Sequence, residues 1–337
     1  MNDTFLANLL DSSPGSYARD AVRRLRAASE QDHGTWQESF TTWIGVLAAA
    51  LRTGRPSLFA SHLTWLRAAS EGRSESTEFL AAGINALHKA LSGSLPEGAE
   101  QLLAPYMAAA EESLGGEGTL PPSALEASPF ASDAIALLQD LVRGNAHQAS
   151  VRVRAAVASG AAPSEVILQL LLPVERELGR LWHLGELSIA EEHFATRIIR
   201  RALGDVLSAA NLEAPERGCI VLAGVAGDEH DIGIAMLGAL CELEGWRAID
   251  LGANIPAEEL ARTCTYSEAD VALISASMAT QLQAMGETIS TLRQHKPALR
   301  ILVGGYALAG TGELWKSLGA DGYSETLAQA LDWIQQA

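Results

Sequence analysis

The 337-residue sequence predicts two helical domains followed by a doubly wound α/β domain with a parallel sheet. Apolar residues recur at three- and four-residue spacing through most of residues 1–114 and 123–213, which indicates amphipathic helices. Over residues 216–337, short β-rich runs alternate with helical stretches, which is typical of strands joined by helical crossovers. Residues 115–122 are rich in Gly and Pro and can neither continue a helix nor form a β-ladder, so we expect a linker there.

The first domain, residues 1–114, is expected to contain five helices. Its clearest helical patterns cover residues 36–51, 58–69 and 79–91, and Gly and Pro residues punctuate the stretches between them. The second domain has four helical patterns, and four helices joined by short loops bury their apolar faces most simply as a bundle. These four patterns cover residues 131–142, 147–158, 164–182 and 190–207.

The third domain is expected to be a doubly wound parallel sheet with helices on both faces. Its strand candidates are the β-rich runs at residues 219–222, 246–251, 271–275 and 300–303. In such folds ligands bind outside the carboxyl ends of the strands, so the loops that follow these runs are the first place to look for a site.

Composition excludes some classes of function. The 41 acidic and 24 basic residues give a formal net charge of −17, which repels phosphate backbones and anionic lipid, so we expect no direct nucleic-acid or membrane binding. The start Met1-Asn2-Asp3-Thr4 lacks the features of a signal peptide, and we expect a cytoplasmic protein. Without a Cys-x-x-Cys spacing, Cys219, Cys241 and Cys264 are expected to be reduced core thiols.

A histidine loop follows the first predicted strand, with the sequence Gly227-Asp228-Glu229-His230-Asp231-Ile232-Gly233. His230 is placed to reach a metal at the edge of the sheet, and Asp228 is suited to accept the proton of its other ring nitrogen. Gly233 leaves room for a bulky group at the start of the next helix. The alternative is a solvated loop histidine without a ligand.

The third domain resembles the cobalamin-binding domain shared by methionine synthase and the mutases. That family has Asp-x-His-x-x-Gly, then Ser-x-Leu, then Gly-Gly. Here 41 residues separate Gly233 from Ser275, and 26 separate Ser277 from Gly304-Gly305. Ser277 stands where the family commonly has Leu.

The resemblance implies a flavodoxin-like domain that binds cobalamin, with His230 as the lower ligand of cobalt in place of the dimethylbenzimidazole base. It also implies that the displaced nucleotide tail runs into the sheet past Ser275 and the Gly304-Gly305 turn. Glycines suit a tail that lies against backbone.

The helical bundle is expected to cap the corrin. Trp182, separated by nine residues from Glu192-His193, resembles the Trp-x9-Glu-His pattern of light-sensing regulators that hold adenosylcobalamin in the dark, and His183 matches them as well. Trp182 is suited to stack on the adenosyl group and Glu192 to bind its ribose hydroxyls. We expect His183 to take the vacant axial position of cobalt after photolysis. His193 is expected to support these cap residues from the bundle interior. The alternative is that Trp182 is core and Glu192-His193 an exposed helical pair.

The first domain, placed ahead of such a module, resembles the photocobilin group in architecture, in which a bilin accompanies the corrin. Because no cysteine precedes Cys219, a bilin such as biliverdin would bind non-covalently. Trp65 would lie against the pyrroles, His62 or His88 near the ring nitrogens, and Arg67 or Arg73 on the propionates. A protein-interaction domain and a haem pocket are the alternatives.

The function expected from these features is light sensing without catalysis. Adenosylcobalamin sits between bundle and sheet, light cleaves its Co–C bond, and the bundle rearranges. We expect a homo-oligomer, dimer or higher, that responds to light, and a downstream protein that the sequence does not identify. The alternative is a corrinoid methyl carrier for a methyltransferase system. A mutase subunit is disfavoured because the chain has no room for a substrate barrel.

Overall fold

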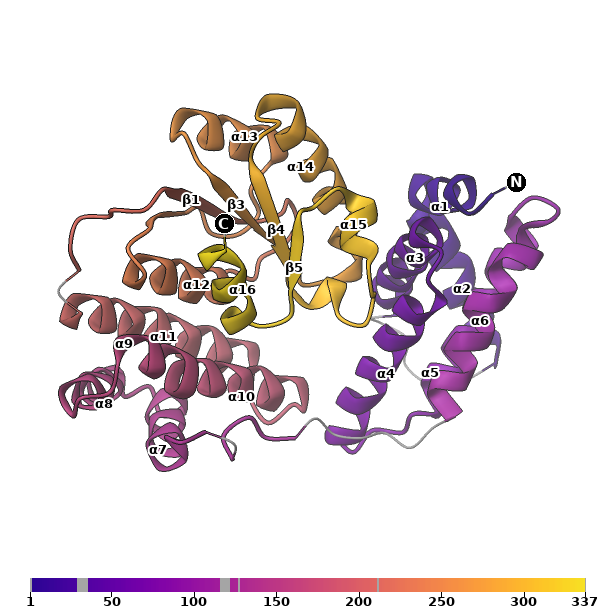
Figure 1. The fold of residues 1–337 in the computed structure, drawn as a ribbon. Coiled ribbons are helices and arrows are strands. Elements are labelled where there is room, and N and C mark those ends of the chain that lie inside the picture. The colour runs from indigo at the N-terminus through magenta and orange to yellow at the C-terminus, as the bar shows by residue number, and fades with distance from the viewer. Residues whose placement is uncertain (1, 29–35, 116–121, 127, 211, 337) are drawn as a thin grey trace. The chain divides into compact units, whose positions relative to one another are not determined.

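The computed structural model describes residues 2–28, 36–115, 122–126, 128–210 and 212–336, and the chain divides into two compact units, Met1–Leu120 and Pro121–Ala337 (Figure 1). Of the expected linker at residues 115–122, only Gly115 and Pro122 are described, and the rest lies outside the described residues. In the described part of the chain, no helix is both long and apolar enough to cross a membrane.

The described part of the first unit contains six helices, one more than predicted. Ser13 separates α1 from α2, and Pro14 starts the second of these helices, where its missing N–H costs nothing. Phe40, Phe59 and Leu47 are fully buried in its core. The helices are α1 (Asp3–Ser12), α2 (Pro14–Ala28), α3 (Trp36–Thr53), α4 (Pro56–Gly72), α5 (Glu78–Ser94) and α6 (Ala99–Gly115).

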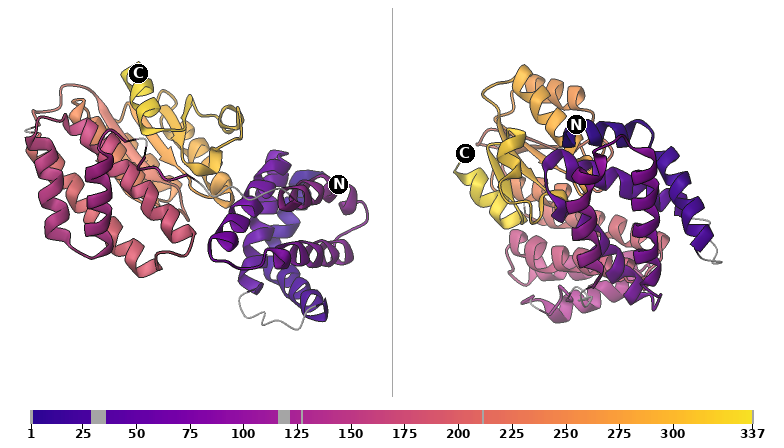
Figure 2. Two further views of the ribbon diagram at one scale, coloured as in Figure 1. Left: turned by 90° about the horizontal axis from the view of Figure 1, so that it is seen from below. Right: turned by 90° about the vertical axis from the view of Figure 1, so that its right-hand side faces the viewer.

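The second unit begins with a bundle of four helical segments that run side by side (Figure 2). The third segment includes a π-helical stretch, η1, just before Pro173, whose missing N–H disrupts regular α-helical hydrogen bonding. The segments are α7 (Ala131–Val142), α8 (Ala146–Ala158), the run of α9 (Pro163–Glu165), η1 (Val166–Leu171) and α10 (Leu172–His183), and α11 (Ile189–Ala209).

A five-stranded parallel sheet forms the rest of this unit, in the order β2-β1-β3-β4-β5. Helices α12 and α16 cover one face, and α13 and α14 cover the other (Figure 1). The strands are β1 (Cys219–Gly224), β2 (Arg247–Asp250), β3 (Val271–Ser275), β4 (Arg300–Gly304) and β5 (Gly322–Ser324). The helices are α12 (Ile232–Leu243), α13 (Ala257–Tyr266), η2 (Ala279–Gln281), α14 (Leu282–His295), η3 (Tyr306–Leu308), α15 (Leu314–Leu318) and α16 (Leu327–Gln335).

This strand order is that of flavodoxin-like folds, and the predicted fold class is confirmed. Bundle and sheet domain share one hydrophobic core, because Met236 and Leu240 of α12 pack among bundle residues such as Leu170 and Ile199. After β2 the chain crosses back over β1 to β3, so the order of strand addition reverses between β1 and β3, and the loops after these two strands open a crevice at their carboxyl ends. The histidine loop is one of them.

Candidate functional site

His230 lies in the loop between β1 and α12, and Asp228 orients its ring. The Asp228 carboxylate is fully buried, and its Oδ1 accepts hydrogen bonds from the backbone N–H and from Nδ1 of His230, at 3.1 and 2.9 Å. The His230 side chain is 69% exposed. The hydrogen bond with Asp228 raises the pKa of His230 and leaves Nε2 as the nitrogen that faces outward to a ligand.

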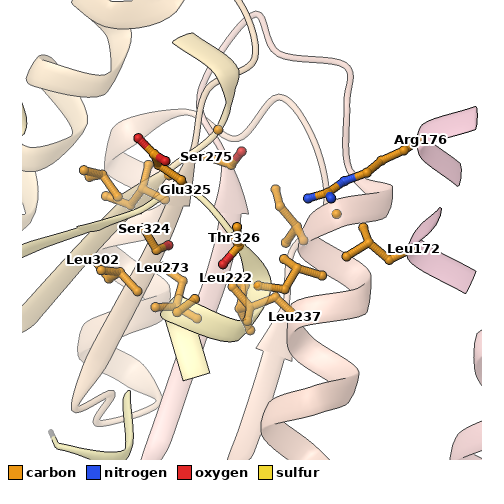
Figure 3. Close-up of a pocket in the computed structure, with 18 residues that line it drawn as sticks. Leu172, Arg176, Leu222, Leu237, Leu273, Ser275, Leu302, Ser324, Glu325 and Thr326 are labelled. Atoms are coloured by element: carbon orange, nitrogen blue, oxygen red, sulfur yellow. The ribbon is translucent and has the colours of Figure 1, made fainter. Parts of the chain in front are cut away.

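A pocket of about 190 Å³ opens beside this loop, at the carboxyl ends of β1, β3 and β4 (Figure 3). Its deep walls are leucines of the strands and of α12, among them Leu222, Leu237 and Leu273, while Ser275 and Thr326 offer hydroxyls. An apolar slot with hydroxyls suits a flat heteroaromatic base carried on a sugar, which is the chemistry of the nucleotide tail of cobalamin. The residues present therefore fit this cofactor.

The predicted glycines Gly233, Gly304 and Gly305 all line this pocket. The physical reason for a glycine at position 305 differs from the expected one, which was the close approach of a nucleotide tail to the backbone. Its φ is +97°, and a Cβ there would lie 2.2 Å from the carbonyl oxygen of Ala276, so the side chain is excluded first by the neighbouring loop and not by a ligand. At Gly233 a Cβ would meet open space.

Ser277 is not among the residues that line the pocket. Its backbone N–H donates to Oδ2 of Asp228 at 2.8 Å, and thereby joins the loop after β3 to the histidine loop. Because the backbone makes this bond, Ser in place of the family's Leu leaves it intact. Sequence reasoning missed three neighbours, Arg176 at the pocket and Asn254 and Gln281 at the histidine loop.

The predicted cap residues lie at the corner between α10 and α11. Trp182 is half-buried and packs against the bundle core, and His183 is 6% exposed. Ser188 caps α11 and exchanges hydrogen bonds with Glu191. The side chain of His193 is 72% exposed, which corrects the expectation that it lies in the bundle interior.

Glu192 connects this corner to the histidine loop. Its carboxylate binds Thr196 at 2.9 Å and Nδ1 of His193 at 2.6 Å, and its negative charge contributes to the raised pKa of His230. Burial and the charge of Glu192 raise the pKa of Glu175 to about 7. Within the described residues, Oε2 of Glu175 is buried without a hydrogen-bond partner, which fits a site that a bound group completes.

In the first unit, His62 and Trp65 stack on α4, with ring centroids 6.2 Å apart and an interplanar angle of 14°. Burial lowers the pKa of His62 to about 4, and its Nε2 has no hydrogen-bond partner among the described residues. His88 binds Glu100 instead, at 2.7 Å. Arg67 is 4% exposed and donates to the Ser113 carbonyl, so it belongs to the packing of the unit, contrary to its expected role on a propionate.

Comparison with known proteins first defines the class. Residues 218–332 match the model of the B12 binding domain, and residues 135–205 match a second B12 binding domain model. The chain is 30% identical over 162 residues to a corrinoid protein of Desulfitobacterium hafniense, covering 46% of this chain and 74% of that protein. The chain therefore belongs to the corrinoid protein family and binds cobalamin.

Other relatives are named for different roles. The chain is 32% identical over 148 residues to the HTH-type transcriptional repressor CarH of Myxococcus xanthus, covering 43% of this chain and about half, 48%, of the repressor. It is 28% identical over 175 residues to dimethylamine corrinoid protein 2 of Methanosarcina acetivorans, covering 50% of this chain and 79% of that protein. The structure of the Methanosarcina barkeri monomethylamine corrinoid protein shares the fold, with a TM-score of 0.54 at 17% identity, covering 61% of this chain and 99% of that one.

Proposed function

We propose that the chain is a light-sensing signalling protein that holds adenosylcobalamin between its bundle and its sheet domain, with His230 as the lower ligand of cobalt. The observation that carries this proposal is the Trp-x9-Glu-His pattern at the corner between α10 and α11, in a bundle that shares its hydrophobic core with the domain of His230. The pattern resembles that of light-sensing regulators, and the similarity to a transcriptional repressor supports a regulatory role.

Adenosylcobalamin supplies a cobalt–carbon bond that visible light cleaves. Asp228 holds His230 in the tautomer that presents Nε2 to the metal. Trp182 would shield the adenosyl group from water, and Glu192 would accept hydrogen bonds from its ribose. Because His183 is buried, it would reach a bound cobalamin only if the corner between α10 and α11 moved, and this movement would be the signal.

Dark retention of the upper group tests this proposal. The wild type and a Trp182→Ala variant are loaded with adenosylcobalamin in darkness, and absorption spectra are followed before and after green light. We expect the wild type to retain the adenosyl form in the dark and to change on illumination, and the variant to lose it in the dark. Trp315→Ala, on α15 of the same unit, is the matched control. Equal dark retention in Trp182→Ala would overturn the capping role.

A corrinoid methyl carrier is the second candidate, favoured by the similarity to a dimethylamine corrinoid protein. On this alternative, methylcobalamin would be retained better than adenosylcobalamin, and replacement of Trp182 or Glu192 would be tolerated. The same loading experiment, repeated with methylcobalamin, separates the two candidates.

For the first unit we propose a non-covalently bound bilin. The stacked pair of His62 and Trp65 supports this, since an imidazole without a partner on Nε2 beside an indole suits a flat chromophore with ring nitrogens. Adding biliverdin should produce a red-shifted, bound absorption band that Trp65→Leu weakens. A haem spectrum, or no bound pigment, would favour a haem pocket or a protein-interaction domain instead.

A further inference from the structure

The peptide groups of Gly227 are held by two side-chain amides from neighbouring loops. Oδ1 of Asn254, in the loop after β2, accepts from the Gly227 N–H at 2.8 Å. Nε2 of Gln281, in the loop after β3, donates to the Gly227 carbonyl at 3.0 Å. Gly227 has a φ of +83° and directly precedes Asp228, so these two amides set the point from which the histidine loop leaves the sheet.

Gln281 makes two further hydrogen bonds. Its Oε1 accepts from the backbone N–H groups of Ser277 and Met278, at 2.9 and 2.8 Å. The Ser277 N–H is shared with Oδ2 of Asp228, the same carboxylate that orients His230. The Gln281 side chain is buried, and a buried amide with three hydrogen bonds has little freedom to move without losing one.

This network joins two functional parts of the site. Ser275, which lines the pocket, lies two residues before Ser277, so the loop after β3 is both a pocket wall and a support of Asp228. A ligand group that fills the pocket and orders this loop would thereby also order the histidine loop. The connection runs through backbone groups that Gln281 holds on both sides.

We propose that Gln281 is a positioning residue that couples occupation of the pocket by the nucleotide tail to cobalt ligation by His230. The proposal rests on His230 as the lower ligand and is independent of light sensing. Through this coupling, the chain would bind a complete cobalamin more tightly than a corrinoid without a nucleotide tail.

The test compares cobalamin with cobinamide, which lacks the nucleotide tail, in the full-length protein. Two quantities are measured in protein labelled with 15N-histidine: the ratio of the two dissociation constants, and the nitrogen splitting in the electron paramagnetic resonance spectrum of the Co(II) form. A 15N doublet reports axial histidine, whereas the cofactor's own 14N base would give a triplet. In Gln281→Met we expect the preference for cobalamin to fall roughly tenfold and the nitrogen splitting to weaken. Gln283→Met, an exposed glutamine of α14, is the matched control and should behave as wild type.

Three outcomes decide the proposal. An unchanged ratio with intact splitting in Gln281→Met would overturn it, and so would equal weakening of both ligands, because a purely structural defect does not discriminate between them. If Gln281→Met does not fold, Gln281→Glu keeps an acceptor for Ser277 and Met278 but loses the donor to Gly227, and the same fall in ratio is expected. His230→Ala is measured alongside: if it keeps the 15N doublet, the assignment of His230 itself is wrong.

Discussion

The fully buried carboxylate of Asp228 accepts two hydrogen bonds from His230 and one from Ser277. Asp228→Asn keeps the shape but replaces one acceptor oxygen by a donor and removes the charge that favours ligation. We expect cobalamin affinity to fall about 10–100-fold, measured by equilibrium titration. Glu229→Gln, an exposed carboxylate of the same loop, is the control. Equal cobalamin affinities in the two variants would show that Asp228 does not strengthen His230 as a ligand of cobalt.

His62 gives a pH-dependent prediction. Burial lowers its pKa from 6.5 to about 4, so between these pH values the unfolded chain binds a proton that the folded chain does not. The stabilisation is complete above pH 6.5 and is lost as the pH falls toward 4, by about 3 kcal/mol in the free energy of unfolding. Urea titrations at pH 4.5, 5.5 and 7 should show a steeper loss in the wild type than in His62→Leu. Parallel curves would contradict a neutral, buried imidazole.

Sequence spacing found the residues of the site whose neighbours are close along the chain or belong to fixed motifs. Asp228 and His230 are two residues apart, and Gly305 marks a turn that needs a positive φ. Gln281 could not be found in this way, because its partner Gly227 lies 54 residues away and glutamines are common on helices and loops. The burial of His183 and the exposure of His193 likewise depend on how α10 meets α11 in space.

At the scale of elements, α10 carries both the proposed cap residues and one residue of the pocket. Its last turn holds Trp182 and His183, while Arg176, almost two turns earlier, points to the pocket (Figure 3). A guanidinium at the mouth of an otherwise apolar pocket favours an anion, and the nucleotide tail carries a phosphodiester. A movement of α10 would therefore be felt at the tail as well as at the upper group.

Arg176→Ala tests this role of α10. We expect cobalamin affinity to fall several-fold and its salt dependence to weaken, with cobinamide affinity unchanged because that ligand lacks the phosphodiester. Titrations at low and high salt measure both quantities. Arg154→Ala, on the exposed side of α8, should match the wild type. A loss of affinity that is equal for cobinamide would place Arg176 outside the tail site.

Elements long enough to show a repeating pattern of apolar residues could be predicted from the sequence, and the short ones could not. The four longer strands follow β-rich runs, and the bundle helices follow clear helical patterns. Strand β5 has only three residues, Gly322–Ser324, too few for any alternation to show. It forms because β4 offers an unpaired edge, which is a property of the sheet and not of the segment.

At the scale of the whole molecule, we expect cobalamin binding to affect the stability of the two units differently. A ligand stabilises the folded state that binds it, by about 2.7 kcal/mol when the free ligand is at a hundredfold excess over the dissociation constant. The pocket and His230 both belong to the unit Pro121–Ala337.

Amide hydrogen exchange of the full chain in the dark, with and without adenosylcobalamin, tests this division. We expect slower exchange at the ends of β1 and β3 and in α10 and α11, and unchanged exchange in α1 to α6. Illumination should then release protection at the corner between α10 and α11 if His183 leaves its buried position there, as proposed. If cobalamin instead protects α1 to α6, the cofactor signal already reaches the first unit in the dark, and light sensing would have to act by releasing that coupling.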